Sequence, residues 1–115
     1  MEDRIEAPDH LKPATREWWQ SVLRDWALEP HHVRLLTLAG ESWDRAQEAR
    51  EVIDADGLTV TDRFDQLRPH PLLAVERDNR IAFARFVREL RLDDSEPEDP
   101  RLPRPGDGPV AYGGQ

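Results

Sequence analysis

The side chains that most often carry catalysis or bind metals are sparse in this sequence and poorly spaced for either task. His31 and His32 are adjacent at a predicted helix start, so their side chains point about 100° apart. Two ligands of one metal on a helix are usually three or four residues apart. These histidines are better explained as surface residues at a helix start. The chain has no cysteine, which excludes disulfides, thiolate metal sites and a cysteine nucleophile.

Sequence motifs of catalysis and nucleotide binding are also missing. The chain has no HExxH, no GxxxxGK[ST] and no GxGxxG. Neither His10 nor His70 has a carboxylate and a serine close by in sequence to complete a catalytic relay. Acid pairs such as Asp54 and Asp56 are unremarkable among 24 acidic residues. We therefore expect a protein that is not an enzyme and that needs no cofactor and no metal.

The sharpest charge pattern is a set of arginines in the last predicted helix. On a helical wheel, one side carries Arg77, Arg80, Arg88 and Arg91. The opposite side is an apolar core face made of Leu72, Val75, Ala82, Phe83, Phe86 and Leu90. Two interpretations stay open, a solvated face paired with neighbouring acids or a face that contacts phosphates. Ile81 and Val87 border the arginines and favour contact with another chain.

Overall charge argues against nonspecific attraction to nucleic acid, but its distribution is uneven. The net charge is −8 over 115 residues, which disfavours binding to polyanions. Residues 63–91 are the exception, since seven arginines and four acids give them a net charge of +3. This basic segment is therefore one candidate for a phosphate-binding surface, and the N-terminal region stays open as the other.

Length and hydrophobic periodicity predict one small, mainly α-helical domain. Apolar residues at helical spacing, with Pro13, Pro30 and Pro71 suited to first turns, predict helices at about 13–28, 30–56 and 71–92. Residues 58–68 alternate as a short extended or hairpin segment, with Asp65 and Gln66 at its turn. An isolated hairpin of this length is marginal in water, so it should lean on the helices or on another subunit.

The segments on either side of the helical domain, residues 13–92, differ from it in composition. Residues 1–12 are expected to form a flexible arm, and the acidic, Pro/Gly-rich residues 93–115 a disordered tail. No apolar run approaches the length of a membrane span and no secretory signal is visible. The expected location is the cytoplasm, with no membrane partner.

Two features of the first two helices point to close packing. Gly40 lies inside the long second helix, where it costs about 1 kcal/mol relative to alanine, so a kink or a close helix crossing is expected there. Trp18 and Trp19 are neighbours and do not fit one narrow stripe, so at least one of them is expected to pack on another element or another subunit.

The order of these segments resembles a known family. A tryptophan-bearing helix after LKPATREWW, a long acidic helix ending EVIDADG, the extended LTVTDRFDQLRPHP and the helix AVERDNRIAFARFVRELRL together look like the small terminase subunit of tailed phages, of the P27 family. The resemblance covers roughly residues 10–92, and its most specific part is the run from residue 57 into the arginine-bearing helix.

The resemblance implies a noncatalytic DNA-packaging factor in the cytoplasm of a host bacterium. Such a protein would form a homo-oligomeric ring, bind double-stranded phage DNA and regulate the large ATPase and nuclease subunit. The expected DNA contacts are Arg63, Arg68, His70, Arg77, Arg80, Arg88 and Arg91. The expected subunit interface comprises Trp18, Trp19, Trp43, Phe64, Ile81 and Val87. The large subunit would dock on Val110 and Tyr112 in the tail.

Two other classes of function remain open. A structural adaptor that does not touch DNA fits the acidic composition. A small DNA-binding transcriptional regulator would require a compact helix-turn-helix and a two-fold dimer, and the sequence indicates neither.

Overall fold

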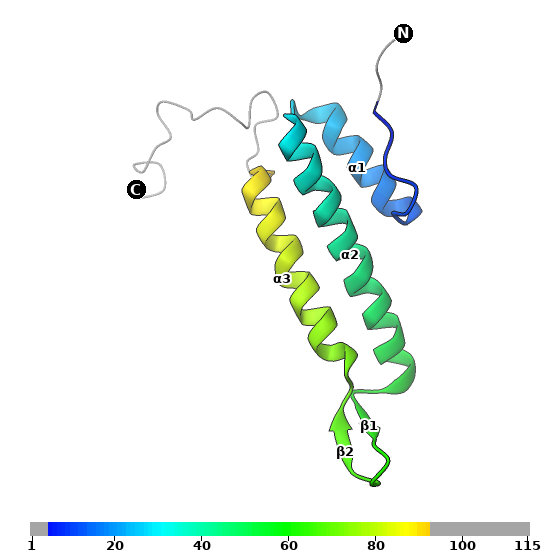
Figure 1. The fold of residues 1–115 in the computed structure, drawn as a ribbon. Helices are drawn as coiled ribbons and strands as arrows, with labels where there is room; N and C mark the ends of the chain where they lie inside the picture. Colours follow the sequence, from blue (N-terminus) through cyan, green and yellow to red (C-terminus); the bar gives the residue numbers. More distant parts are fainter. Residues whose placement is uncertain (1–4, 93–115) are drawn as a thin grey trace, which may run out of the picture.

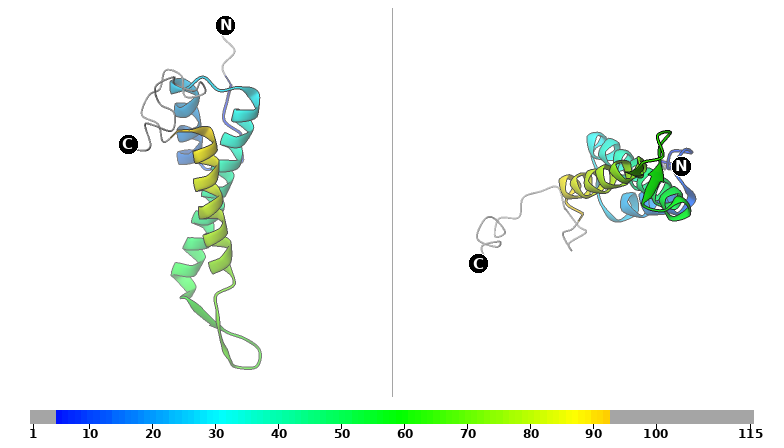
Figure 2. Two further views of the ribbon diagram at one scale, coloured as in Figure 1. Left: turned by 90° about the vertical axis from the view of Figure 1, so that its left-hand side faces the viewer. Right: turned by 90° about the horizontal axis from the view of Figure 1, so that it is seen from below.

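The computed structural model describes residues 5–92, which form three helices and a β-hairpin (Figure 1). The helices are α1 (Pro13–Asp25), α2 (Pro30–Asp56) and α3 (Leu72–Leu90), and the strands are β1 (Thr59–Thr61) and β2 (Leu67–Pro69). Helices α2 and α3 lie side by side and antiparallel, and the hairpin that connects them projects beyond their ends (Figures 1 and 2). The predicted mainly α fold with three helices and a short hairpin is confirmed.

Helix α1 starts with a cap supplied by another helix. Its N-cap residue, Lys12, offers no side-chain cap. Instead, the buried Asp44 of α2 accepts hydrogen bonds from the Lys12 backbone N–H at 2.8 Å and from the Thr15 hydroxyl at 2.6 Å. A helix N-terminus favours a negative charge at this position. Asp44 therefore fixes the position of α1 on α2.

Two helix ends differ slightly from the predicted bounds. Helix α1 ends at Asp25 instead of residue 28, since Trp26 is extended (φ −130°, ψ 144°) and Glu29 precedes a proline, which disfavours helical backbone. Helix α3 ends at Leu90 instead of residue 92, because Arg91 adopts a left-handed conformation (φ 62°) that stops the helix.

Helix α2 spans the predicted residues and has a glycine with a defined role inside it and another at its end. The contact at Gly40 is close: a Cβ there would lie 3.1 Å from Thr15 Cγ2 and 3.3 Å from Leu11 Cδ1. Helices α1 and α2 therefore approach closely at Gly40, and a close helix crossing was one of the two predictions made for this glycine. Gly57 ends the helix with φ 96°, a conformation that favours glycine.

The hairpin is held together by strand pairing and by hydrogen bonds in its turn. Its strands pair antiparallel with Thr59 opposite Pro69 and Thr61 opposite Leu67. Asp62 accepts hydrogen bonds from the backbone N–H groups of Phe64 at 2.8 Å and of Gln66 at 3.0 Å. Asp65 has φ 66°, as expected of a residue in the turn.

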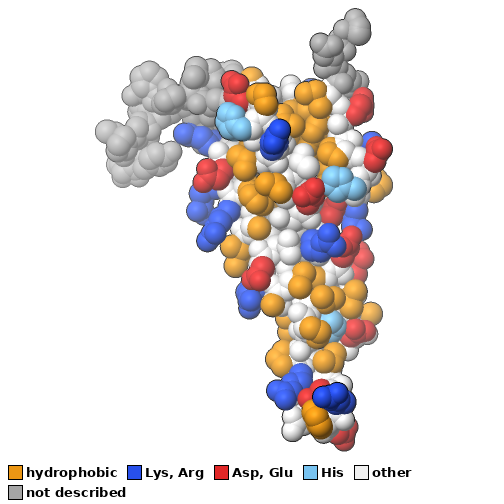
Figure 3. All heavy atoms as spheres, in the orientation of Figure 1, with side chains coloured by type: hydrophobic (Ala, Val, Ile, Leu, Met, Phe, Trp, Pro, Cys, Tyr) orange, Lys and Arg blue, Asp and Glu red, His pale blue; other side chains and the backbone are white. Residues whose placement is uncertain are grey.

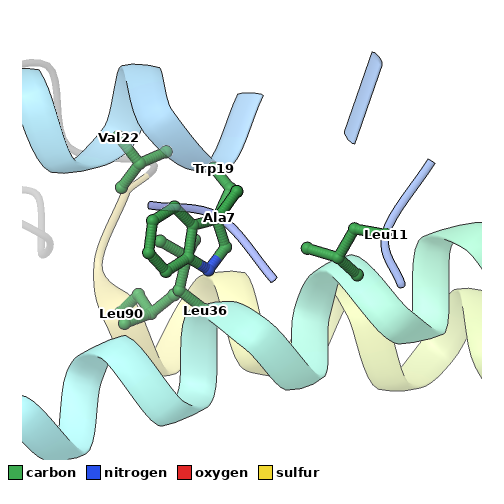
Figure 4. Close-up of a cluster of buried hydrophobic side chains, with 6 residues drawn as sticks. All are labelled: Ala7, Leu11, Trp19, Val22, Leu36 and Leu90. Atoms are coloured by element: carbon green, nitrogen blue, oxygen red, sulfur yellow. The ribbon is translucent and has the colours of Figure 1, made fainter. Parts of the chain in front are cut away.

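The main hydrophobic core lies at the end of the molecule where α1 covers α2. Figure 4 shows the Trp19 ring among the buried side chains of Ala7, Val22, Leu36 and Leu90, and Leu11 of the same cluster lies apart from them against α2. Residues 5–12 thus contribute two core side chains and pack on the helices. This differs from the flexible arm expected for residues 1–12, because Ala7 and Leu11 bury apolar surface that a free arm would leave in water.

Helix α3 is incompletely covered. Its only buried side chains are Glu76 and Leu90. The other members of its predicted core face stay partly exposed: Leu72, Val75, Ala82, Phe83 and Phe86. One neighbouring helix covers too little of an amphipathic helix to bury its whole apolar side. The predicted tail, residues 93–115, lies outside the described residues.

Candidate interaction surfaces

The α3 arginines form an exposed surface, as their spacing predicted. The side chains of Arg77, Arg80, Arg88 and Arg91 are all exposed. Leu73, Ile81 and Glu76 share a groove of about 450 Å³ with the first two arginines. We call Arg77, Arg80, Arg88 and Arg91 together the arginine face. It combines positive charge with apolar surface.

Two members of the arginine face have acidic neighbours on the same helix. Arg77 Nε lies 3.2 Å from Asp78 Oδ1, and Arg80 lies 3.7 Å from Glu76 Oε2. Glu76 also accepts a hydrogen bond from Arg50 of α2 at 3.1 Å. Exposed pairs contribute only about 0–1 kcal/mol each. Arg77 can therefore exchange the exposed Asp78 for a phosphate at little cost. Glu76 is mostly buried, but it keeps Arg50 as a partner if Arg80 turns to a phosphate.

The two hairpin arginines differ in their roles. Arg68 donates to Asp62 Oδ2 at 3.0 Å and to Gln66 Oε1 at 3.1 Å. These contacts stabilise the turn. Arg63 lies over the ring of Phe64, with its guanidinium carbon 5.1 Å from the ring centroid, and it is exposed at the tip. Of the two, Arg63 is the more accessible to a ligand.

The structure contradicts the assignment of His70 as a DNA contact. Its side chain is only 5% exposed. Nδ1 accepts a hydrogen bond from the Leu72 backbone N–H at 3.0 Å, and Nε2 lies 2.9 Å from Asp56 Oδ2. Because Nδ1 accepts, Nε2 carries the proton and donates to Asp56. His70 thus links the end of α2 to the start of α3 and is not available to a phosphate.

An aromatic groove lies where the three helices meet. Trp18 of α1, Trp43 of α2 and Phe83 of α3 surround it, with the Phe83 ring centroid 5.7 Å from that of Trp18 and 5.0 Å from that of Trp43. The groove measures about 410 Å³ and is completed by Ala14 and Thr15. We call it the aromatic groove. Trp43 is 45% exposed, so aromatic surface is open to a partner.

Two of these three rings, Trp18 and Trp43, were predicted to be interface residues, whereas Phe83 was not. Phe83 was predicted to lie on the core face of α3. It lies on that side, toward Trp18 and Trp43, but it is only half-buried. Helical periodicity shows which side of α3 carries Phe83, but it does not show whether α1 covers that side chain. Packing of α1 onto α2 decides this, and no local signal in the sequence reports that packing.

The assignment of Trp19 to a subunit interface is wrong. Trp19 is 1% exposed, and its indole N–H donates to Thr37 Oγ1 at 3.1 Å. Its neighbour Trp18 packs on Phe83 of α3. The expectation that at least one of the two rings packs on another element is therefore met within a single chain.

A third surface is the hairpin itself. Phe64 and Leu67 are 68% and 73% exposed, and Leu58 at the base of β1 is 66% exposed. Figure 3 shows hydrophobic and basic side chains together on this projecting end. On α3, Ile81 is 49% exposed and Val87 is half-buried. Phe64, Ile81 and Val87 are therefore all at least partly accessible, as an interface requires.

The described part of the chain holds neither a cluster of metal-ligating side chains nor a membrane-crossing helix. Among residues 5–92, no three His, Cys, Asp or Glu side chains gather closely enough to hold a metal ion. In the same range, none of the helices combines the length and apolar character that crossing a membrane requires. Val110 and Tyr112, the expected docking residues for a large subunit, lie outside the described residues.

The acidity of Asp62 departs clearly from the ordinary. Its pKa is lowered by the backbone N–H of Gln66, by the Arg68 guanidinium and by the backbone N–H of Phe64, and desolvation opposes these effects. Hydrogen bonds to the ionised form have this effect. The turn is therefore formed by charged Asp62.

Comparison of the sequence with protein-family models, with curated proteins and with solved structures finds no match.

Proposed function

We propose that this protein is the noncatalytic small subunit of a phage DNA-packaging terminase. In this proposal it assembles into a homo-oligomer, binds double-stranded phage DNA through the arginine face and Arg63, and regulates a large ATPase and nuclease subunit in the cytoplasm of a host bacterium. Support comes from the resemblance in segment order over roughly residues 10–92 and from the exposed surfaces described above.

The observation that carries the proposal is the incomplete burial around α3 and the hairpin. Three hairpin side chains are about two-thirds exposed or more, and most of the apolar side of α3 is only partly covered. Exposed apolar surface of this kind favours contact with another chain. In a ring, the neighbouring subunit would cover this surface with a different patch of its own, because ring interfaces are heterologous.

The DNA-binding part of the proposal depends on repetition. The whole chain has a net charge of −8, so one copy of the arginine face is expected to bind DNA weakly. A ring presents this face once per subunit. Simultaneous contacts then raise the overall affinity without stronger individual contacts.

The first experiment is native mass spectrometry of the full chain. We expect a closed high-order homo-oligomer for the wild-type protein and smaller species for the variant Phe64→Ser/Leu67→Ser. Leu38→Ser is the matched control, because Leu38 is 44% exposed but lies on α2, away from the hairpin. A wild-type monomer or dimer, both alone and with duplex DNA present, would contradict the proposal.

The second experiment measures binding to duplex DNA by gel shift at several salt concentrations. Arg77→Gln/Arg80→Gln should weaken binding and reduce the salt slope by roughly one for each phosphate that is no longer bound. Arg24→Gln/Arg34→Gln is the control, because it removes the same charge from exposed positions on α1 and α2. Equal weakening by both pairs would mean that the arginine face has no special role.

One observation favours a second function, a structural adaptor that does not bind DNA. Acidic groups lie within 4 Å of Arg68, Arg77 and Arg80, which is the arrangement expected of a solvated face. The gel shift separates the two functions, since an adaptor would assemble but would not retain DNA even at low salt.

A further inference from the structure

The arginine face ends where the described chain ends, and the residues that follow are strongly acidic. Helix α3 stops at Leu90, and Arg91 in its left-handed conformation turns the chain out of the helix. The Leu92 N–H then bonds back to the Val87 carbonyl at 3.3 Å. Residues 93–99, DDSEPED, contain five acids and no base. An acidic stretch of sequence thus follows directly after the arginine-bearing helix.

The lengths of the two rows match. Arg77 and Arg91 are 14 residues apart on the sequence, which is about 21 Å along a helix. Seven residues of extended chain span about 23 Å. A segment that starts after Leu92 and turns back along α3 can therefore reach from the last turn of the helix to Arg77.

The charges are complementary as well. Arg88 is exposed and has no ion-pair partner among residues 5–92. Arg77 has only an exposed pair with Asp78, and Arg80 shares the mostly buried Glu76 with Arg50 at the longer distance of 3.7 Å. Carboxylates can pair with guanidinium groups in the same bidentate geometry that phosphates use. A carboxylate-rich segment is thus a competitor for whatever anion the arginine face binds.

We propose that residues 93–99 bind the arginine face of their own chain and reduce its affinity for DNA. The effect on DNA affinity rests on the proposed DNA-binding function, whereas the intramolecular contact does not depend on it. When the acidic segment covers the arginines nine-tenths of the time, the apparent dissociation constant for DNA is about tenfold higher, because only the uncovered fraction binds. Withdrawal of the segment by a partner would release the arginine face.

The test compares the wild-type chain with two full-length variants of equal net charge. The first neutralises the acidic segment, as Asp93→Asn, Asp94→Asn, Glu96→Gln, Glu98→Gln and Asp99→Asn. The second neutralises five acids elsewhere, as Glu2→Gln, Asp3→Asn, Glu17→Gln, Asp25→Asn and Glu51→Gln. Both changes raise the net charge by five, so general attraction to DNA is matched.

Two readouts separate failure of this inference from failure of the proposed function. One is the affinity for a nonspecific duplex at low salt, which should rise about tenfold more in the first variant than in the second. The other needs no DNA: the side-chain Nε–H resonances of Arg77, Arg80 and Arg88 should shift in the first variant only. Shifts without any DNA binding would support the contact and reject the DNA role. Unshifted resonances, or equal gains in affinity for the two variants, would overturn the inference.

Discussion

The two ends of the α2–α3 pair are built differently. In the three-layered end, residues 5–44 and 83–92, α1 and the segment before it pack against α2 (Figure 1), and Trp18 of α1 also contacts Phe83 of α3. The hairpin end, residues 45–82, consists of two helices and a projecting hairpin. Its buried apolar side chains, within the described chain, are only Ala46, Ala49 and Ile53.

Exposed apolar side chains are distributed the other way. Five of the eight large hydrophobic residues that are exposed in the described chain lie in the hairpin end: Val52, Leu58, Phe64, Leu67 and Ile81. Burial of apolar surface is the main favourable contribution to folding. We infer that the three-layered end supplies most of the stability of one chain, and that the hairpin end has apolar surface left for association.

The largest effect should come from the centre of the three-layered end. Trp19→Ala removes a fully buried indole from the main hydrophobic cluster. We expect the free energy of unfolding to fall by about 3–5 kcal/mol, because apolar burial is removed and a cavity remains. Urea denaturation followed by circular dichroism measures this change.

Trp43→Ala is the matched control for that prediction. It removes the same side chain from a site where it is 45% exposed, so we expect a loss of less than about 1 kcal/mol. Equal losses for the two variants would contradict the distinction between a stabilising core and an open aromatic groove.

The next effect tests the junction of α1 with α2. Asp44→Ala leaves the Lys12 backbone N–H and the buried Thr15 hydroxyl without their shared acceptor. We expect a loss of about 2–3 kcal/mol, since hydrogen bonds to a charged group contribute more than neutral ones. Asp9→Asn, at a fully exposed side chain, should change the unfolding free energy by less than about 0.5 kcal/mol.

The helices were predictable because their signals are local. Proline at a first turn, glycine at the end of α2 and apolar residues at helical spacing act within a few residues of one another. Asp44 shows the opposite case. It caps helix α1 by binding Thr15, which lies 29 residues away from it in sequence. Nothing local distinguishes this acid from the exposed acids around it.

The candidate sites were predictable to a different extent for charge and for burial. The helical wheel correctly placed four arginines on an exposed side of α3. It did not indicate that His70 would be buried, because that depends on Asp56 and on the return of β2 to the start of α3. Likewise, the choice between Trp18 and Trp19 as the core residue depends on the rotation of α1 against α2.

His70 gives a smaller effect at the boundary between the helix pair and the hairpin. His70→Ala removes the acceptor for the Leu72 N–H and the bond to Asp56. We expect a loss of about 1–2 kcal/mol in unfolding free energy and no specific loss of DNA binding. The variant should keep the salt slope of the wild-type gel shift, whereas a slope reduced by one would restore His70 as a phosphate contact.

The smallest effect concerns the hairpin turn alone and depends on pH. Because the folded-state pKa of Asp62 is lowered, ionised Asp62 stabilises the turn at pH values above the unfolded pKa, and this contribution is lost as the pH falls through the folded pKa. In acid, the amide resonances of Phe64 and Gln66 should therefore move toward random-coil positions while those of α1 stay in place. Asp62→Asn should abolish this pH dependence, because the amide does not titrate, whereas Asp65→Asn should retain it. A turn and an α1 that lose order together at one pH would mean that the two ends unfold as a single unit, and that the hairpin end is more firmly held than its sparse burial indicates.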